Sequence, residues 1–186
     1  PSGIVGRLKS IAKHFRIGRQ EDSHEFLRFL LEAMQKREGA TMVNDLFGGL
    51  LESTVKCQQC GHVSRCRDPM MDLSLDIRQA ANVEAAIQQF CQPEKLSQSA
   101  RYRCEGCGQT VAAAKQFHLH QLPACLTIHL KRFSVNLHTG YPVKVNREVG
   151  FAEQMELADA TGLHHYRLYA LIVHEGSGCN VGHYHA

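Results

Sequence analysis

Two short segments of the chain, Cys57-Gln58-Gln59-Cys60-Gly61 and Cys104-Glu105-Gly106-Cys107-Gly108, carry the same C-x-x-C-G pattern. Each segment presents two thiolates from a tight turn, and its glycine suits a backbone that needs a positive φ. Four thiolates complete the tetrahedral coordination of a structural zinc ion. Because the segments lie far apart in the sequence, we expect the ion to join two distant hairpins of an extended arm.

The eight cysteines leave two alternatives open. Four lie outside the paired segments: Cys66, Cys91, Cys125 and Cys179. A disulfide framework is one alternative, although chains that need one are usually short, secreted and rich in loops. His62, beside the first segment, could also replace a cysteine as a ligand. Zinc binding by Cys57, Cys60, Cys104 and Cys107 is the prediction we adopt, and it favours a reducing compartment.

The composition sets broad bounds on fold and function. A chain of 186 residues has the length of one domain, and its 44% apolar content is enough for a core. The net charge of +3 gives no argument for nucleic acid or an anionic membrane as the main partner. No apolar run approaches the roughly 18–20 residues that span a bilayer.

Hydrophobic periodicity predicts helices first and strands afterwards. Residues 1–36 read as helical, and Asp22 lies three positions before Glu25, as in a capping box. Residues 46–135 read mainly as strands, with a short helix that begins after Asn82. The segment from Tyr166 to Val173 is apolar on both faces, which predicts a strand buried on both sides.

His183 follows a glycine-rich loop, Gly176-Ser177-Gly178, that comes after this last predicted strand. The pKa of an ordinary histidine lies near neutrality, so the side chain can accept and return a proton in catalysis. Such a loop can also open to admit a peptide. His183 is therefore a candidate general base, one of twelve histidines in the chain.

Five motifs in a fixed order carry a family resemblance. In addition to the two cysteine segments they are Gly18-Arg19-Gln20-Glu21-Asp22-Ser23-His24-Glu25-Phe26-Leu27, Leu130-Lys131-Arg132-Phe133 and Gly182-His183-Tyr184. In this combination the chain resembles the ubiquitin-specific proteases over nearly its whole length. The stretches Ile11-Ala12-Lys13-His14-Phe15-Arg16 and Asp45-Leu46-Phe47-Gly48-Gly49 are most similar to the branch that includes nucleolar deubiquitinases.

The resemblance implies an α+β fold, a papain-like cysteine protease with thumb, zinc-bearing fingers and palm, here incomplete. Residues 1–45 would form part of the thumb, 46–135 the fingers and the start of the palm, and 136–186 the palm strands that end at the histidine motif. His183 would be the catalytic base. Asp22, Glu25 and Tyr184 would bind the tail of ubiquitin. The implied partners are ubiquitin and ubiquitinated proteins, within a larger assembly in one alternative, and the implied location is nuclear, nucleolar or cytoplasmic.

The chain departs from the family at the nucleophile. The Asn-x-Gly-Asn-Thr-Cys type of box is absent, and the third member of the triad would fall after Ala186. Cys179 lies near His183 in sequence, but a glycine loop does little to activate a thiol, since thiolates are favoured at helix N-termini. We therefore expect a fragment of a deubiquitinase catalytic domain. The alternatives are an inactive relative that binds ubiquitin or acts as a scaffold and, more remotely, a zinc-ribbon module for nucleic acid.

Overall fold

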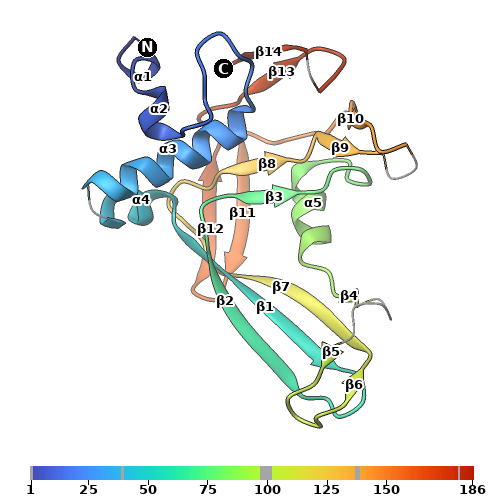
Figure 1. Cartoon of the computed structure of the whole chain (residues 1–186). Helices are drawn as coiled ribbons and strands as arrows, with labels where there is room; N and C mark the ends of the chain where they lie inside the picture. The colour runs from blue at the N-terminus through green and yellow to red at the C-terminus, as the bar shows by residue number, and fades with distance from the viewer. Residues whose placement is uncertain (1, 39, 97–101, 137–138, 180) are drawn as a thin grey trace.

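A computed structural model describes residues 2–38, 40–96, 102–136, 139–179 and 181–186. Helices gather at the N-terminal end, a long antiparallel sheet extends away from them, and short strands fill the C-terminal part (Figure 1). None of the described helices is long and apolar enough to cross a membrane. The predicted α+β class is confirmed.

The helical part contains α1 (Ser2–Val5), α2 (Leu8–Ile11), α3 (Ser23–Glu38) and α4 (Ala40–Phe47). The predicted long helix is correct, and it begins after Asp22 because that carboxylate accepts the backbone N–H of Glu25 at 2.8 Å. Phe15 is 1% exposed and its ring lies 5.7 Å from that of Phe29, edge to face, which seats the α2 segment on α3. Helix α4 was not expected from the sequence, and the predicted break at Gly39 falls outside the described residues.

The arm is a four-stranded antiparallel sheet in the order β2-β1-β7-β4. Its strands are β1 (Gly49–Cys57), β2 (Val63–Met70), β4 (Glu94–Lys95) and β7 (Ala113–Gln121). The small hairpin of β5 (Tyr102–Arg103) and β6 (Thr110–Val111) lies at the far end of this sheet, beside the turn that joins β1 to β2 (Figure 1). The two hairpins therefore meet at the tip, as the sequence predicts.

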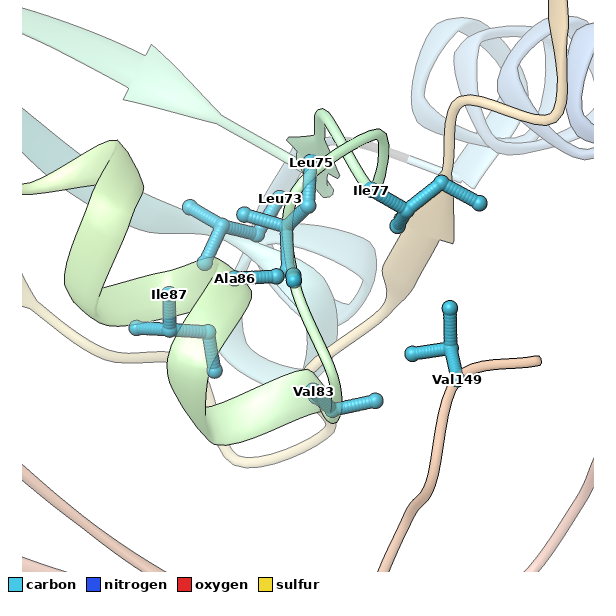
Figure 2. Packing of buried hydrophobic residues seen from close by; sticks show 8 residues of the cluster. Leu73, Leu75, Ile77, Val83, Ala86, Ile87 and Val149 are labelled. Carbon is cyan, nitrogen blue, oxygen red and sulfur yellow. The ribbon is translucent and has the colours of Figure 1, made fainter. Parts of the chain in front are cut away.

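The main core lies where the arm joins the rest of the molecule. Helix α5 (Val83–Phe90) packs against β3 (Leu73–Leu75), which pairs in parallel with β8 (Ile128–Leu130). Figure 2 shows the buried side chains from β3, α5 and the segment of Val149 converging on one volume. The cluster consists of Leu73, Leu75, Ile77, Ala80, Val83, Ala86, Ile87 and Val149. Asn82 caps α5 as predicted, because its side chain accepts the N–H of Ala85 at 2.8 Å.

In the described residues of the C-terminal part, strands pair as three short antiparallel hairpins. They are β9 (Phe133–Val135) with β10 (Pro142–Lys144), β11 (Gln154–Asp159) with β12 (Gly162–Arg167), and β13 (Val173–Glu175) with β14 (His183–His185). The two strands β13 and β14 lie beside the start of α3 in Figure 1, although they come from the other end of the sequence.

The prediction of one buried strand from Tyr166 to Val173 is wrong. Strand β12 ends at Arg167, β13 begins at Val173, and the residues between them have no strand pairing. Tyr169 is 75% exposed and Ile172 54%. The apolar pattern indicates that these side chains are suited to burial, but no described strand pairs with this stretch to cover it.

Candidate active site and metal centre

The two cysteine segments adopt matching turns at the tip of the arm. In the first, Cys57 donates its N–H to the carbonyl of His62 at 2.9 Å, and Gly61 donates to the carbonyl of Cys57 at 3.1 Å. The second repeats both bonds, from Cys104 to the carbonyl of Gln109 and from Gly108 to that of Cys104. Gly61 and Gly108 have φ values of 75° and 68°, a backbone that side chains with a Cβ rarely adopt.

These turns bring four sulfur atoms together. The Sγ atoms of Cys57, Cys60, Cys104 and Cys107 all lie within 4.8 Å of one another. The Sγ atoms of Cys60 and Cys104 are 3.6 Å apart, which is close to the edge of a tetrahedron with zinc–sulfur bonds of about 2.3 Å and much longer than a disulfide. The donor set therefore fits a structural zinc ion, as predicted.

The backbone at the tip favours the thiolate of Cys57, whereas the neighbouring thiol of Cys57 raises the pKa of Cys60. Cys57 and Cys104 are 1% and 0% exposed. The backbone N–H of Cys60 points at the sulfur of Cys57, and this hydrogen bond lowers the pKa of the Cys57 thiol to about 7. His62 lies against Gly106 in the second turn and is not among the four clustered ligands, so its alternative role as a ligand gains no support.

The residues expected to bind the tail of ubiquitin come from opposite ends of the chain. Asp22 uses both carboxylate oxygens: Oδ1 accepts the N–H of Glu25 at the start of α3, and Oδ2 accepts the hydroxyl of Tyr184 at 3.3 Å. Burial, followed by the charge of Asp22, raises the pKa of the Tyr184 hydroxyl, so it remains a donor. The structure thus joins Asp22 and Tyr184 directly.

His183 lies on β14 between two residues that are bonded to the start of α3. Gln20 Nε2 donates to the carbonyl of Gly182 at 2.9 Å, and Tyr184 reaches Asp22 on the other flank. The imidazole of His183 is exposed and opposite Glu175 in the hairpin register. An exposed ring held on a fixed backbone can exchange protons with a substrate placed beside it.

Glu25 and Cys179 occupy different surroundings from the Asp22–Tyr184 pair. Glu25 is exposed and its carboxylate lies 3.5 Å from Nε2 of His14. Both Glu25 and Asp22 therefore stand at the positive N-terminal end of α3, where carboxylates are stabilised. Cys179 is half-buried in the loop between β13 and β14.

A group of polar side chains behind Asp22 was missed by the sequence reasoning. The rings of His24 and His129 stack at 3.7 Å between centroids. Nε2 of His24 contacts the carboxylate of Asp72 at 3.0 Å, and Nδ1 of His129 contacts the hydroxyl of Ser74 at 2.7 Å. Burial, followed by the neighbouring His24, lowers the pKa of His129. The available signal was position, since His24 lies inside the Gln-Glu-Asp motif and His129 directly precedes Leu130.

Comparison with known proteins decides the family. The family model described as "Ubiquitin carboxyl-terminal hydrolase" matches residues 1–186. The chain belongs to this family. It is 37% identical to ubiquitin carboxyl-terminal hydrolase 42 of Homo sapiens over 99% of the chain, and 37% identical to ubiquitin carboxyl-terminal hydrolase 25 of Arabidopsis thaliana over 100%. It spans 15% and 31% of the lengths of these two relatives.

Solved structures of the family agree in fold. One is the SAGA DUB module of Ubp8, Sgf11, Sus1 and Sgf73 bound to monoubiquitin, with a TM-score of 0.83 and 27% identity over 97% of this chain and 43% of that one. Another is the same module bound to ubiquitin aldehyde, with a TM-score of 0.84 and 25% identity over 97% and 44%. The resemblance inferred from the five motifs is therefore confirmed, and so is the papain-like class of the fold.

Proposed function

We propose that this hydrolase-family chain is part of a thiol-dependent deubiquitinase that cleaves the peptide or isopeptide bond after the C-terminal glycine of ubiquitin. The observation that carries the proposal is the joining of the Gln20–Asp22 segment to both neighbours of His183. Residues remote in sequence converge there on one exposed imidazole and one oriented carboxylate. The solved relatives named above contain ubiquitin or ubiquitin aldehyde, and that supports ubiquitin as the partner of this chain too.

His183 would act as the base and then as the acid of the reaction. A cysteine thiol gives its proton to the imidazole, and the resulting thiolate attacks the carbonyl carbon of the terminal glycine. The imidazolium returns that proton to the leaving amine as the carbon–nitrogen bond breaks, which leaves a thioester. Water then attacks the thioester with His183 again accepting the proton, and ubiquitin is released with a free carboxylate.

Asp22, Glu25 and Tyr184 would bind the extended tail of ubiquitin. Asp22 and Glu25 place two carboxylates at the beginning of α3, where a cationic segment is attracted. The bond from Tyr184 fixes Oδ2 of Asp22 before any ligand arrives. A carboxylate oriented in advance costs less ordering when it binds a guanidinium group.

The zinc-bearing arm would grip the globular part of ubiquitin. Its sheet ends in a tip made of two hairpins, and the buried residues of the main core cluster lie elsewhere. Zinc at the four cysteines would supply the stability that a core supplies elsewhere. Thiolate ligands also require a reducing compartment, which supports the nucleus, nucleolus or cytoplasm as the location. Assembly with further subunits, as in the SAGA module, is a second element of this proposal.

An inactive ubiquitin-binding relative is the competing proposal. The structure is compatible with it, because the Asp22–Tyr184 bond and the four clustered cysteines need no catalytic thiol. Such a protein would retain the arm and the Asp22–Tyr184 pair but would carry out no hydrolysis, because loss of the nucleophile removes most of the rate of a triad.

A ubiquitin with a C-terminal electrophile distinguishes the two. The protein at its natural length is treated with this probe, and the modified cysteine is located by mass mapping. Adduct formation, together with hydrolysis that is lost in His183→Ala, supports the deubiquitinase. Tight ubiquitin binding without an adduct or hydrolysis supports the inactive relative. Absence of ubiquitin binding in a zinc-loaded sample contradicts both.

A further inference from the structure

We propose that Gln20 is a positioning residue for His183, and that it acts through the carbonyl of Gly182. The inference rests on the proposed function, since it assigns a role in setting the imidazole for proton transfer. Gln20 lies in the loop before α3, and its Nε2 donates to that carbonyl at 2.9 Å across 162 positions of sequence. The accepting oxygen belongs to the peptide group whose nitrogen is that of His183.

Gly182 is also confined by the hairpin itself. A Cβ at this position would collide with the ring of His174 and the carbonyl of Glu175, so the peptide lies flush against β13. The Gly182 peptide is therefore held between the packing of the hairpin and the hydrogen bond from Gln20. Rotation of this peptide would turn the backbone of His183 and carry the imidazole with it.

The residue after His183 is held by the same segment that contains Gln20. Tyr184 donates to Asp22, two residues after Gln20. Successive side chains of a strand point to opposite faces, so fixing Tyr184 on one face leaves the ring of His183 on the other. Gln20 and Asp22 thus hold the residues before and after the base, while the ring itself stays unobstructed.

The hairpin needs such external bonds because it is small. Strands β13 and β14 share only three residue pairs. It is also tethered to the β9–β10 hairpin, because Lys144 Nζ donates to the carbonyls of His174 and Gly176 and the ring of Phe133 packs edge to face on that of His174. Without the bond from Gln20, the orientation of β14 relative to α3 would depend on the contacts of Tyr184 with Asp22 and Ser23.

The test compares Gln20→Glu with a matched control, Gln116→Glu. Gln20→Glu keeps the shape of the side chain but removes the N–H donor and sets a carboxylate against a carbonyl. Gln116 also donates its amide to a backbone carbonyl, that of Cys91 at 3.0 Å, at the side of the arm sheet. The same chemical change is therefore made in two places, only one of which lies beside His183.

Nuclear magnetic resonance tests whether Gln20 orients His183, and this test does not require an active enzyme. In the zinc-loaded chain, the backbone amide and imidazole resonances of His183 should shift in Gln20→Glu and remain unchanged in Gln116→Glu. Unchanged His183 resonances in Gln20→Glu would overturn the proposal, even if the protein proves to be an active deubiquitinase. Shifted resonances in a protein that does not hydrolyse ubiquitin would support the positioning and contradict only the proposed function.

Steady-state kinetics of the full-length protein distinguishes a positioning role of Gln20 from a general loss of stability. With ubiquitin that carries a C-terminal fluorogenic amide, Gln20→Glu should lower kcat roughly tenfold while KM changes by less than about twofold, as expected for one lost hydrogen bond that matters in the transition state. The deficit should narrow at low pH, where the protonated carboxyl can donate to Gly182. A parallel fall in the melting temperature with unchanged kcat, or a deficit that is independent of pH, would contradict the assignment.

Discussion

The hydroxyl of Tyr184 donates to Oδ2 of Asp22 over 3.3 Å, while Oδ1 of the same carboxylate caps α3 through the N–H of Glu25. One carboxylate therefore serves a helix start and a strand from the other end of the chain. The capping role is structural and the negative charge is available to a cationic ligand. These two roles can be separated by mutation, because an asparagine caps a helix without carrying charge.

Asp22→Asn should weaken ubiquitin binding while leaving the fold intact. The amide oxygen still accepts the N–H of Glu25 and the amide nitrogen can donate to the hydroxyl oxygen of Tyr184, so the free energy of unfolding should change by less than about 0.5 kcal/mol. The charge that would meet the ubiquitin tail is lost, and the dissociation constant should rise roughly tenfold or more. Titration calorimetry with ubiquitin and urea unfolding measure the two effects.

Asp22→Ala and Asn82→Ala provide the comparison. Asp22→Ala should lose both binding and about 1 kcal/mol of stability, since the cap of α3 is removed. Asn82→Ala removes the cap of α5 and should cost a similar amount of stability without altering ubiquitin affinity. Equal binding losses in Asp22→Ala and Asn82→Ala would show that the affinity change merely reports stability.

Removal of zinc should disable the arm before it unfolds the remainder of the molecule. Structural zinc sites contribute roughly 10–16 kcal/mol of apparent binding free energy at neutral pH, and the hairpins at the tip have little core to replace that contribution. With increasing chelator, ubiquitin affinity should fall while the helical circular dichroism signal of α3 and α5 persists. Cys104→Ser should reproduce the loss.

Cys66→Ser is the matched control for the metal site. Cys66 is exposed on β2, away from the sulfur cluster, so its replacement should leave both zinc content and ubiquitin affinity unchanged. Loss of binding and of helical signal in one cooperative transition would contradict an arm that unfolds separately.

The sequence predicted those parts of the fold that local patterns control. The cap at Asp22, the cap at Asn82 and the paired turns at Cys57 and Cys104 depend on a few neighbouring residues, and each is present as expected. The buried strand from Tyr166 to Val173 failed because burial depends on which strands lie alongside. Apolar alternation shows that a face suits a partner, but it carries no information about where the partner comes from.

In the candidate site, too, the sequence predicted the features that local patterns control and missed those that depend on the tertiary fold. The four cysteine ligands follow from spacing, and the structure brings their sulfurs together. The bond from Gln20 to Gly182 joins segments at opposite ends of the chain, and the stacking of His24 on His129 joins α3 to β8. Contacts of this kind follow from the tertiary fold, so motif reading could name His24 as part of a motif without revealing its partner.

Leu75→Ala should destabilise the main core strongly. Leu75 is 0% exposed and belongs to the cluster in Figure 2, and truncation leaves a cavity that the surrounding β3, β8 and α5 can fill only in part. The expected loss is about 2–5 kcal/mol in the free energy of unfolding by urea. Leu163→Ala, at a site that is 58% exposed, should change it by less than about 0.5 kcal/mol. Similar losses at the two sites would contradict the assigned position of the core.

Asp159 should make stability depend on acid pH. Its side chain is 0% exposed, and burial alone would raise the pKa of the carboxyl. Hydrogen bonds from the Thr161 hydroxyl at 2.6 Å and the Leu122 N–H at 2.7 Å, together with His164 at 3.0 Å, outweigh burial and hold the pKa well below its usual range. A carboxyl whose pKa is lower in the folded state contributes stability that is fully present above its unfolded pKa of about 3.9 and is lost as the pH falls below that value.

Asp159→Asn should therefore differ from the natural chain in a pH-dependent way. The difference in free energy of unfolding should be large at neutral pH and should shrink as the pH is lowered from about 4 toward 2, because the Asp159 carboxyl of the unfolded chain takes up a proton over this range, which favours unfolding of the natural chain and has no counterpart in Asp159→Asn. Asp45→Asn, at an exposed position of α4, should show almost no difference at either pH. Urea unfolding of the three proteins at both values measures this, and zinc loss in acid cancels because they share the same metal site. If the difference in free energy of unfolding between Asp159→Asn and the natural chain stays constant with pH, the charge of Asp159 does not stabilise the fold. Uncharged contacts, and not a buried carboxylate, would then join the β11–β12 turn to the base of the arm.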